Sequence, residues 1–448
     1  MARGIARVDP SRHGVSSRRR GEIGLLSLVA ILFFNVSGGP YGLEDAVGTL
    51  GPGLALVLLV VTPLVWSLPV LLAMAELAAA LPEEGGYVVW VRRAFGRFWS
   101  FQVGWWSWIN SFVDVAVYPA LFADYVGFWR PDMSALERWA LVLAFIWVLT
   151  AINLAGVRIT GWVAVAMAGV SLLPVIVLTA VAGTQLREVP WRPFAAEEGS
   201  LLTGLGLGLA IMMWNYSGWD APTTTLGETR DPGPSFRRAV WVALPLITLA
   251  YVLPVAASLS AVEGWEDWDT GHWPVVAEAI GGPWLANLVA VGAVIATAGL
   301  FLSLLLTNSR LPYALALAGQ MPAALGRRHP RFGTPWGAVV LSSVAYSLCA
   351  FWSFKELIVL NIWLYSITLV LELAAFVALR LREPGLPRPW RVGGGRAGMW
   401  LVAVLPSLCC GLAMATAGWM NTAVGVAAAL TGPLAYLLWR APASRAMS

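Results

Sequence analysis

The sequence predicts an all-α polytopic membrane protein with about 12 transmembrane helices. Three observations support this fold class. The chain is 58% hydrophobic and only 12% charged, whereas soluble proteins carry about 25% charged residues. Apolar runs of about 20 residues, long enough to cross the hydrocarbon core, recur along the chain. Two of these runs are interrupted by Gly and Pro, which propagate a helix poorly.

The apolar runs place the predicted spans, with boundaries defined to within several residues. They fall near 23–49, 53–80, 99–128, 135–156, 159–183, 200–230, 236–262, 283–311, 335–353, 356–380, 398–418 and 421–440. If spans one and six each begin a group of five helices, the odd number per group forces the two groups into opposite orientations. We therefore expect an inverted 5+5 repeat with broken first and sixth helices, followed by two C-terminal helices. The expected segments are a cytoplasmic N-terminal segment at 1–22, the first repeat at 23–183, the second repeat at 199–380 and the last two helices at 398–440.

The basic residues predict which loops face the cytoplasm. With the N-terminus inside, 24 of the 29 Lys and Arg residues lie on the inner side and 5 on the outer side, as the positive-inside rule describes. We expect both termini in the cytoplasm and the protein in a prokaryotic-type plasma or inner membrane. The net charge of +4 then needs no nucleic-acid partner. Arg18, Arg19 and Arg20 precede an apolar stretch too long for a signal-peptide core, so no cleavable signal is expected.

The composition also argues against several other functions. Cys349, Cys409 and Cys410 fall in apolar spans and are expected to pack as small residues. The 3 His residues are scattered across loops and give little support for a His-based metal or proton relay. The sequence has no Walker A loop for ATP and no arrangement that resembles a hydrolytic site. We expect no enzymatic activity, no cofactor, no metal and no obligatory protein partner.

The first interruption reads Ser37-Gly38-Gly39-Pro40. Unwound backbone inside a bilayer is tolerated only where it is buried in protein or lines a cavity. Its N–H groups would start an outer half-helix, whose positive dipole end attracts anions. Ser37, Gly38 and Gly39 are therefore predicted to bind substrate, although Pro40 removes one donor. The alternative is a Gly-Pro kink that merely bends a packed helix.

Glu44 and Asp45 follow this interruption within about a turn and a half. A charged group at the centre of a membrane costs at least ~2.5 kcal/mol, so two adjacent carboxylates need partners or water. Both are candidate substrate-binding residues, and Glu44 is a candidate carrier of the coupling proton. The alternative is that they are solvated at the outer mouth or cap helix ends.

The second interruption runs from Asn215 to Pro222. Asp220 beside it is predicted to hold an alkylammonium group by charge pairing, aided by cation–π attraction. The residues predicted to supply the aromatic face and nearby carbonyls are Trp214, Tyr216, Ser217 and Trp219. Because Trp is abundant in this chain, the alternative for each aromatic ring is that it contacts lipid or packs within the protein.

Asp114 sits in the middle of the third span, too deep for solvation by lipid headgroups. It would bind an ammonium group, carry the coupling proton or hydrogen-bond a neighbouring helix, and Asp220 is the third proton candidate. On the tenth span, Asn361 and Tyr365 are possible cavity residues, while the role of Glu372 is left open.

Three further acidic residues lie near the inner ends of the spans. Glu76 is expected to pair with an inner-side Arg rather than to touch substrate. Glu228 and Asp231, beside Arg230, indicate an ion-pair gate or a solvated loop.

Motifs spread over most of the chain resemble those of polyamine uptake permeases. They include residues 35–45, Asn35-Val36-Ser37-Gly38-Gly39-Pro40-Tyr41-Gly42-Leu43-Glu44-Asp45, residues 82–90, Pro82-Glu83-Glu84-Gly85-Gly86-Tyr87-Val88-Val89-Trp90, and residues 214–220, Trp214-Asn215-Tyr216-Ser217-Gly218-Trp219-Asp220. These permeases belong to the amino acid–polyamine–organocation (APC) superfamily, near its L-type amino acid transporter-like group. The resemblance implies a LeuT-like fold and proton-coupled uptake or exchange. One departure is that plant polyamine permeases carry an acid in the eighth helix, whereas residues 296–303 here contain none.

Two substrates follow from these observations. The first is a polyamine or related organic cation, imported or exchanged by a proton-coupled secondary active transporter through alternating access; the intramembrane acids favour it. The second is an amino acid bound by its carboxylate at Ser37–Gly39, which the missing eighth-helix acid favours. In either case the expected partners are a small amine-bearing or amino acid substrate and the lipid bilayer. Sodium is the alternative coupling ion, because unwound carbonyls with Ser or Thr partners can bind it.

Overall fold

The computed structural model describes residues 22–196, 208–209, 211–350, 354–416 and 418–440. Every secondary-structure element in these ranges is a helix. Ile23 and Thr229 form an isolated β-bridge. Eight helical segments of the described chain are long and apolar enough to cross a membrane. They are Pro52–Ala80, Ala135–Leu154, Val157–Gly183, Pro232–Ala261, Pro283–Leu317, Trp363–Arg382, Gly395–Thr416 and Trp419–Trp439. The prediction of an all-α polytopic membrane protein is confirmed.

The other predicted spans are broken or short. The first span consists of α1 (Leu25–Val36) and α2 (Glu44–Leu50), separated by the non-helical residues 37–43. In the sixth span, residues 211–215 are helical and the 3-10 helix η3 (Ala221–Glu228) follows after another non-helical stretch. Both predicted breaks are therefore present. The predicted start of the sixth span, 200–207, and most of the N-terminal segment lie outside the described residues.

The remaining helices of the first half follow the predicted order. They are α3 (Pro52–Thr62), the π-helical η2 (Pro63–Ser67), α4 (Leu68–Ala80), α5 (Tyr87–Phe95), α6 (Arg97–Asp114), α7 (Val117–Gly127), α8 (Ala135–Leu154) and α9 (Val157–Gly183). Local chemistry explains several boundaries. Ser134 and Glu137 form a capping box at the start of α8, and Gly156 with φ +115° allows the turn into α9.

The second half and the two C-terminal helices complete the described chain. They are α11 (Pro232–Ala261), η4 (Trp265–Asp267), α12 (Trp273–Gly281), α13 (Pro283–Asn308), α14 (Arg310–Leu317), η5 (Ala323–Gly326), α15 (Trp336–Cys349), α16 (Phe354–Arg382), α17 (Gly395–Thr416) and α18 (Trp419–Arg440). Pro283 stands in the first turn of α13, where its missing N–H has no intrahelical partner to lose.

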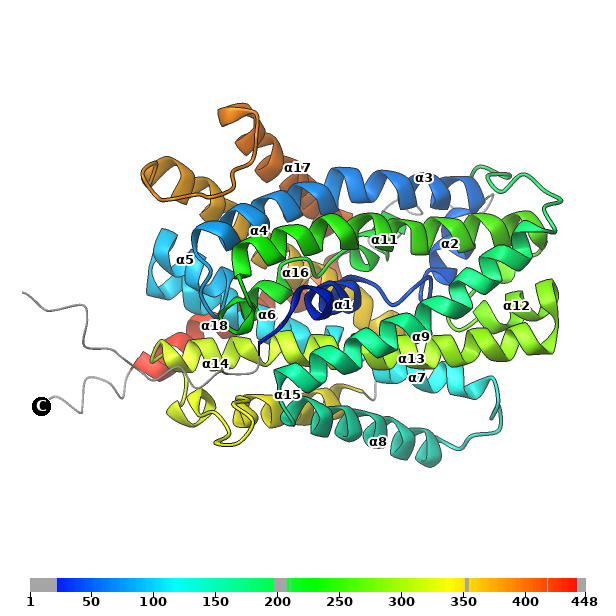
Figure 1. Cartoon of the computed structure of the whole chain (residues 1–448), viewed down its shortest axis with the longest axis horizontal. Coiled ribbons are helices and arrows are strands. Elements are labelled where there is room, and N and C mark those ends of the chain that lie inside the picture. The colour runs from blue at the N-terminus through cyan, green and yellow to red at the C-terminus, as the bar shows by residue number, and fades with distance from the viewer. Residues whose placement is uncertain (1–21, 197–207, 210, 351–353, 417, 441–448) are drawn as a thin grey trace, which may run out of the picture.

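The long helices run side by side around the broken ones. In Figure 1, α3, α11, α9 and α13 extend along the longest axis, while α1 lies in the middle of the bundle. The short α1 packs against α11, α9 and α13. Within the segment Pro283–Leu317, which contains α13, the most apolar stretch is 72% buried, whereas that of Trp419–Trp439, in α18, is 17% buried. The core therefore surrounds the first break and α13, and α18 turns most of its apolar surface outward.

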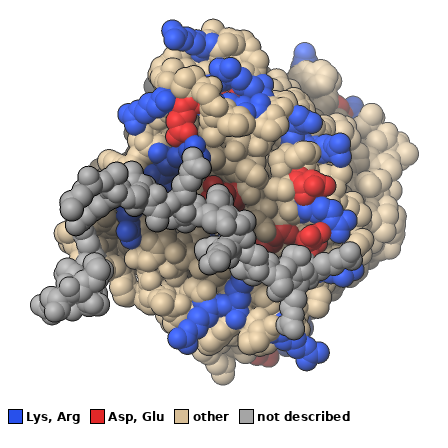
Figure 2. All heavy atoms as spheres, turned by 60° about the vertical axis from the view of Figure 1, so that its left-hand side comes forward, with Lys and Arg blue, Asp and Glu red and all other residues tan. Residues whose placement is uncertain are grey.

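Charged residues gather at one end of this bundle. Figure 2 shows the end nearest α5, α14 and α18, where Lys and Arg gather with Asp and Glu between them. At this end Arg93 pairs with Glu383 at 2.7 Å, and this hydrogen-bonded guanidinium lowers the pKa of the Glu383 carboxyl. These residues belong to the loops predicted to face the cytoplasm. The arrangement agrees with the predicted charge bias.

Candidate functional site

The two breaks lie against each other in the centre of the bundle. Gly218 has φ +93°, and a Cβ at this position would lie 2.2 Å from the carbonyl oxygen of Asn35. Only glycine allows this approach of the two backbones. The hydroxyl of Tyr251, on α11, donates toward the carbonyl oxygens of Val36 and Asn215, at 3.3 and 2.8 Å. These carbonyls belong to the helix ends that precede the breaks, where intrahelical donors are missing.

A small polar cavity lies beside the breaks. Its volume is about 40 Å³, room for on the order of three water molecules. It is lined by Asn35, Val36, Tyr87, Ser107, Asn110, Ser111, Asp114, Tyr118, Trp214, Ser217, Gly218, Asp220, Ala221, Leu304, Asn308, Asn361, Tyr365 and Thr368. These residues come from the end of α1, from the second break and its flanking helical residues, and from α5, α6, α7, α13 and α16. Because a small solute needs more room, the cavity must widen to receive one.

Asp114 ends α6 at the wall of this cavity. Its carboxylate accepts a hydrogen bond from the indole N–H of Trp214 at 3.2 Å. The Trp214 ring in turn stacks on Tyr118, with ring centroids 6.2 Å apart and planes inclined by 19°. Asp114 therefore joins the third span to the second break, and its carboxylate stands beside two aromatic faces.

Asp220 lines the cavity from the second break. It accepts a hydrogen bond from the hydroxyl of Tyr365 at 2.6 Å, and the same oxygen of Tyr365 accepts the N–H of Gly218 at 3.2 Å. The phenol thus fixes the carboxylate and the unwound backbone together. No Lys or Arg stands among the described residues that line the cavity. Two carboxylates and the rings of Tyr87, Tyr118, Trp214 and Tyr365 make the wall suitable for a cation.

Two predicted aromatic residues lie outside this wall. Tyr216 donates its hydroxyl to the carbonyl of Leu59 at 2.8 Å and is fully buried. Trp219 is also fully buried, and its indole N–H has no hydrogen-bond partner among the described residues. Both residues belong to the non-helical stretch, and neither lines the cavity. Ser217 does line it, although its hydroxyl donates to the carbonyl of Met213.

The first break is packed against α13 rather than exposed to the cavity. A Cβ on Gly38 would lie 2.7 Å from Cδ1 of Leu300. Gly39 has φ +111° and donates its N–H to the hydroxyl of Ser37 at 3.1 Å. The residues of this region that line the cavity are Asn35 and Val36. The predicted substrate residues Ser37, Gly38 and Gly39 are thus placed next to the cavity without lining it.

Glu44 and Asp45 also lie apart from the cavity. Glu44, fully buried at the start of α2, accepts the N–H of Gly42 at 2.6 Å and the hydroxyl of Tyr125 at 2.7 Å. Asp45 accepts the hydroxyl of Thr270 at 2.5 Å. Carboxylates at a helix N-terminus are stabilised by its dipole. Glu44 stands in the first turn of α2, and its role in substrate or proton binding stays a prediction.

Several wall residues were not singled out by sequence reasoning. They are Tyr87, Ser107, Asn110, Ser111, Tyr118, Leu304, Asn308 and Thr368. A signal was present in the third span, where Ser107, Asn110, Ser111 and Asp114 recur at the three- and four-residue spacing of one helix face. Such a polar stripe within an apolar span is typical of a helix that faces a cavity.

Comparison with known proteins identifies the family. A family model for amino acid permeases matches residues 23–439. The chain belongs to the amino acid permease family. A probable polyamine transporter of Arabidopsis thaliana is 33% identical over 431 residues, which are 96% of this permease and 86% of that protein. A polyamine transporter of Oryza sativa subsp. japonica is 34% identical over 407 residues, covering 90% and 75%. An uncharacterized transporter of Mycobacterium bovis is 31% identical over 352 residues, covering 77% and 76%.

The comparisons and the fold agree. The permease is a membrane transporter of the APC type, as the resemblance implied. The predicted boundaries of its two repeats stay a prediction.

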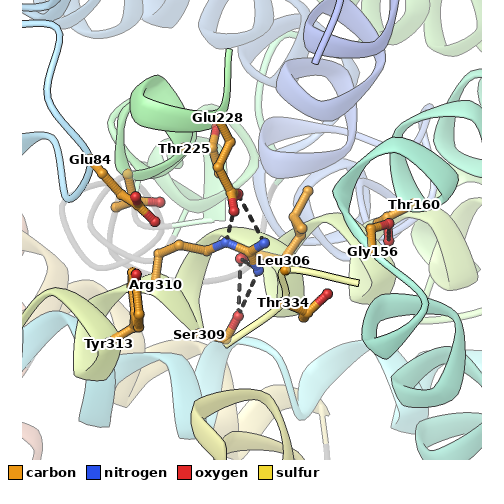
Figure 3. Close-up of polar contacts among 12 residues, drawn as sticks. Glu84, Gly156, Thr160, Thr225, Glu228, Leu306, Ser309, Arg310, Tyr313 and Thr334 are labelled. Atoms are coloured by element: carbon orange, nitrogen blue, oxygen red, sulfur yellow. Dashed lines mark hydrogen bonds and ion pairs between the residues drawn. The ribbon is translucent and has the colours of Figure 1, made fainter. Parts of the chain in front are cut away.

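The inner end of the second broken helix is held by buried ion pairs. Glu228, the last residue of η3, accepts from Nη2 and Nε of Arg310 at 3.0 and 3.2 Å, and the Arg310 side chain is fully buried. Arg328 lies 3.3 Å from Glu228 and also pairs with Glu84. Figure 3 shows Glu84, Glu228 and Arg310 converging from the loop before α5, from η3 and from α14. Together with Arg328 these residues form what we call the inner cluster.

Glu228 forms ion pairs in the inner cluster, with Arg310 and Arg328. The neighbouring Arg230 pairs instead with Glu22, at 3.0 Å, in an exposed position. A second buried group contains Glu76, which lies 3.2 Å from Arg388 and 3.5 Å from Arg380 and accepts the N–H of Val392. The expected pairing of Glu76 with inner-side Arg residues is confirmed.

Proposed function

We propose that this permease is a secondary active transporter that imports or exchanges a polyamine or related organic cation by alternating access, coupled to a proton. One observation carries the proposal. The cavity between the breaks presents Asp114 and Asp220 with no Lys or Arg among its described lining residues. A buried carboxylate without a counter-charge is costly. An alkylammonium group would supply that charge and contact the aromatic wall. Plant relatives that bear the name polyamine transporter support this substrate class.

An amino acid is the second candidate. The observation in its favour is that the eighth span contributes Leu304 and Asn308 to the cavity, and neither is acidic. The contacts of the first break oppose an amino acid substrate, because the N–H of Gly39 already donates to the hydroxyl of Ser37 and Gly38 packs against Leu300. A substrate carboxylate would have to displace these contacts.

The small cavity fits a step within an alternating-access cycle. It has room for only a few water molecules, and the inner cluster links η3 to α14 and to the loop before α5. Opening toward the basic end of the bundle requires these ion pairs to separate. We propose that this basic end faces the cytoplasm, together with both termini, since the positive-inside rule favours that orientation. Labelling of single cysteines from each side of the membrane checks the orientation, and a C-terminus labelled from outside would contradict it.

The substrate is tested with purified permease in liposomes. Labelled putrescine uptake is measured in competition with putrescine, spermidine, agmatine, arginine and leucine. We expect the diamine, spermidine and agmatine to compete strongly and leucine to compete weakly, because only the former bring excess positive charge to Asp114 and Asp220. Labelled leucine serves as the reciprocal substrate. Uptake of leucine that diamines do not inhibit would favour the amino acid candidate.

A further inference from the structure

Glu372, deep in α16, differs from the other buried carboxylates of the described chain. The side chain is 1% exposed, and neither oxygen has a hydrogen-bond partner among the described residues. By contrast Glu44, Asp220 and Glu228 each accept hydrogen bonds, and Glu76 accepts one as well. An ionised carboxylate left in this state inside a membrane span is costly. Glu372 therefore requires a cation or a proton.

The position of Glu372 places it just beyond the cavity. Tyr365 and Thr368 line the cavity, and Glu372 follows them by seven and four residues on the same face of α16. A rise of about 1.5 Å per residue puts it roughly 6 Å past Thr368. Arg380, buried with Glu76 near the basic end, stands eight residues further along the same face. Glu372 thus lies between the cavity and the predicted cytoplasmic side.

Among the described residues, no group around Glu372 gives it a positive partner. Four titratable groups interact electrostatically with Glu372: Tyr87 of α5, Asp220 of the second break, Cys410 of α17 and Tyr365 of α16 itself. Other elements packed against α16 carry titratable groups that already have partners: Asp114 on α6 accepts a hydrogen bond from Trp214, and Glu76 on α4 pairs with Arg380 and Arg388. Tyr118 on α7 and Tyr436 on α18 are the tyrosines of two further neighbouring elements. The charged neighbour that acts on Glu372 most directly is Asp220, which has the same sign.

A proton suits this position better than a bound cation. Two neighbouring carboxylates cannot both ionise cheaply. Asp220 accepts a hydrogen bond from Tyr365 that stabilises its anion, whereas Glu372 accepts none. Glu372 does not line the cavity, so an alkylammonium group held at Asp220 has no open path to it. A proton needs no such space.

We propose that Glu372 is the binding site of the coupling proton in this permease, separate from the carboxylates that face the substrate. This inference rests on the proposed proton-coupled transport. In the closed state the proton is bonded to a carboxyl oxygen of Glu372. When the inner end opens, that O–H bond breaks, the proton passes to cytoplasmic water and the carboxylate becomes charged. The site is reloaded from the other side of the membrane.

The test compares E372Q with wild type in liposomes carrying an imposed inward proton gradient. Gln resembles the protonated carboxyl in size but cannot release a proton. We expect the gradient to stimulate wild-type putrescine uptake and to lose its effect on E372Q, while exchange of internal for external putrescine persists. The matched control is E278Q, which removes an exposed carboxylate on α12 and should keep the stimulation. Stimulation of E372Q equal to that of wild type would overturn the proposal.

A second readout reports the proton directly. Infrared spectroscopy of wild type and E372D near neutral pH should show a protonated-carboxyl band that shifts when the side chain is shortened by one methylene group. The absence of a shift would count against Glu372 even if E372Q failed to fold. The two proposals also fail in different ways. Putrescine uptake that does not respond to the proton gradient would contradict the proton site at Glu372 and leave the amine substrate supported. Gradient-driven leucine uptake that loses its gradient dependence in E372Q would contradict the polyamine substrate and leave the proton site supported.

Discussion

The two broken helices look alike in sequence and differ in what they do. At the first break, Glu44 accepts hydrogen bonds from the neighbouring Gly42 and from Tyr125 of α7, and it does not line the cavity. At the second break, Asp220 faces the cavity and its partner is the phenol of Tyr365, from a distant helix. The first break thus supplies mainly backbone and helix ends to the cavity region, whereas the second supplies a chemical group.

The two breaks are also anchored at opposite ends. The half of the first span that is predicted to face outward, α2, is fixed by the buried Glu44 and its bond to α7. The half of the sixth span that is predicted to face the cytoplasm, η3, is fixed by the buried Glu228 and its pair with Arg310. This opposition is what an inverted repeat would produce. A carboxylate beside a broken helix can therefore anchor that helix, as Glu44 does, or face the cavity, as Asp220 does, and its partners decide which.

The largest effect is expected at the anchor of the second break. R310A would leave Glu228 buried with only part of its counter-charge, and breaking a buried pair costs about 3–5 kcal/mol. We expect a markedly lower unfolding temperature of the solubilised permease. The matched control is R230A, which removes an exposed ion pair with Glu22 worth about 0–1 kcal/mol. Equal unfolding temperatures for the two variants would show that the inner cluster does not hold η3.

The next effect concerns Asp220, the carboxylate of the second break that lines the cavity. In D220N the charge is lost while the side-chain shape is kept. A hydrogen bond to a charged group contributes about 1.5–3 kcal/mol, so putrescine binding should weaken about 10–100-fold, and leucine binding much less. Titration of both solutes into the purified variant measures this difference. An equal loss for both would make Asp220 a structural residue.

The packing of the first break gives a smaller expected loss of stability. G38V would press against Leu300, where a Cβ alone already comes within 2.7 Å, and such overpacking costs about 1–3 kcal/mol. Uptake should be abolished although the variant reaches the membrane. G38A should be affected less, and G127A is the control because a Cβ there meets nothing within 4 Å. Near-normal uptake by G38V would reduce the break to a tolerant kink.

The smallest effect is expected at the anchor of the first break. In E44Q the amide oxygen can accept from only one of the two donors, the N–H of Gly42 or the hydroxyl of Tyr125. We therefore expect the free energy of unfolding to fall by about 1 kcal/mol. The preference for putrescine over leucine should stay that of wild type, in contrast to D220N. Unfolding curves and the competition panel measure the two quantities. A changed preference in E44Q would mean that the first break also carries a substrate carboxylate.

Much of the fold was determined by the sequence alone. Long apolar runs must form helices in a bilayer, because helices satisfy their own backbone hydrogen bonds there, and Gly and Pro mark where two of them stop. The loops rich in Arg indicated which ends of the spans gather together. Asp114 and Asp220 were found for the same reason, since a carboxylate deep in an apolar span demands a partner.

The tertiary structure decided which of these residues face the cavity. Glu44 and Asp220 both follow a break, and nothing in the chain reveals that Tyr125 bonds one and Tyr365 the other, because those partners lie 81 and 145 residues away. Arg310 and Glu228 are likewise 82 residues apart. Glu372 became notable only when the packing around α16 left both of its oxygens without a partner among the described residues. Sequence spacing fixes the side of a helix on which a group lies, and packing alone fixes which group it meets.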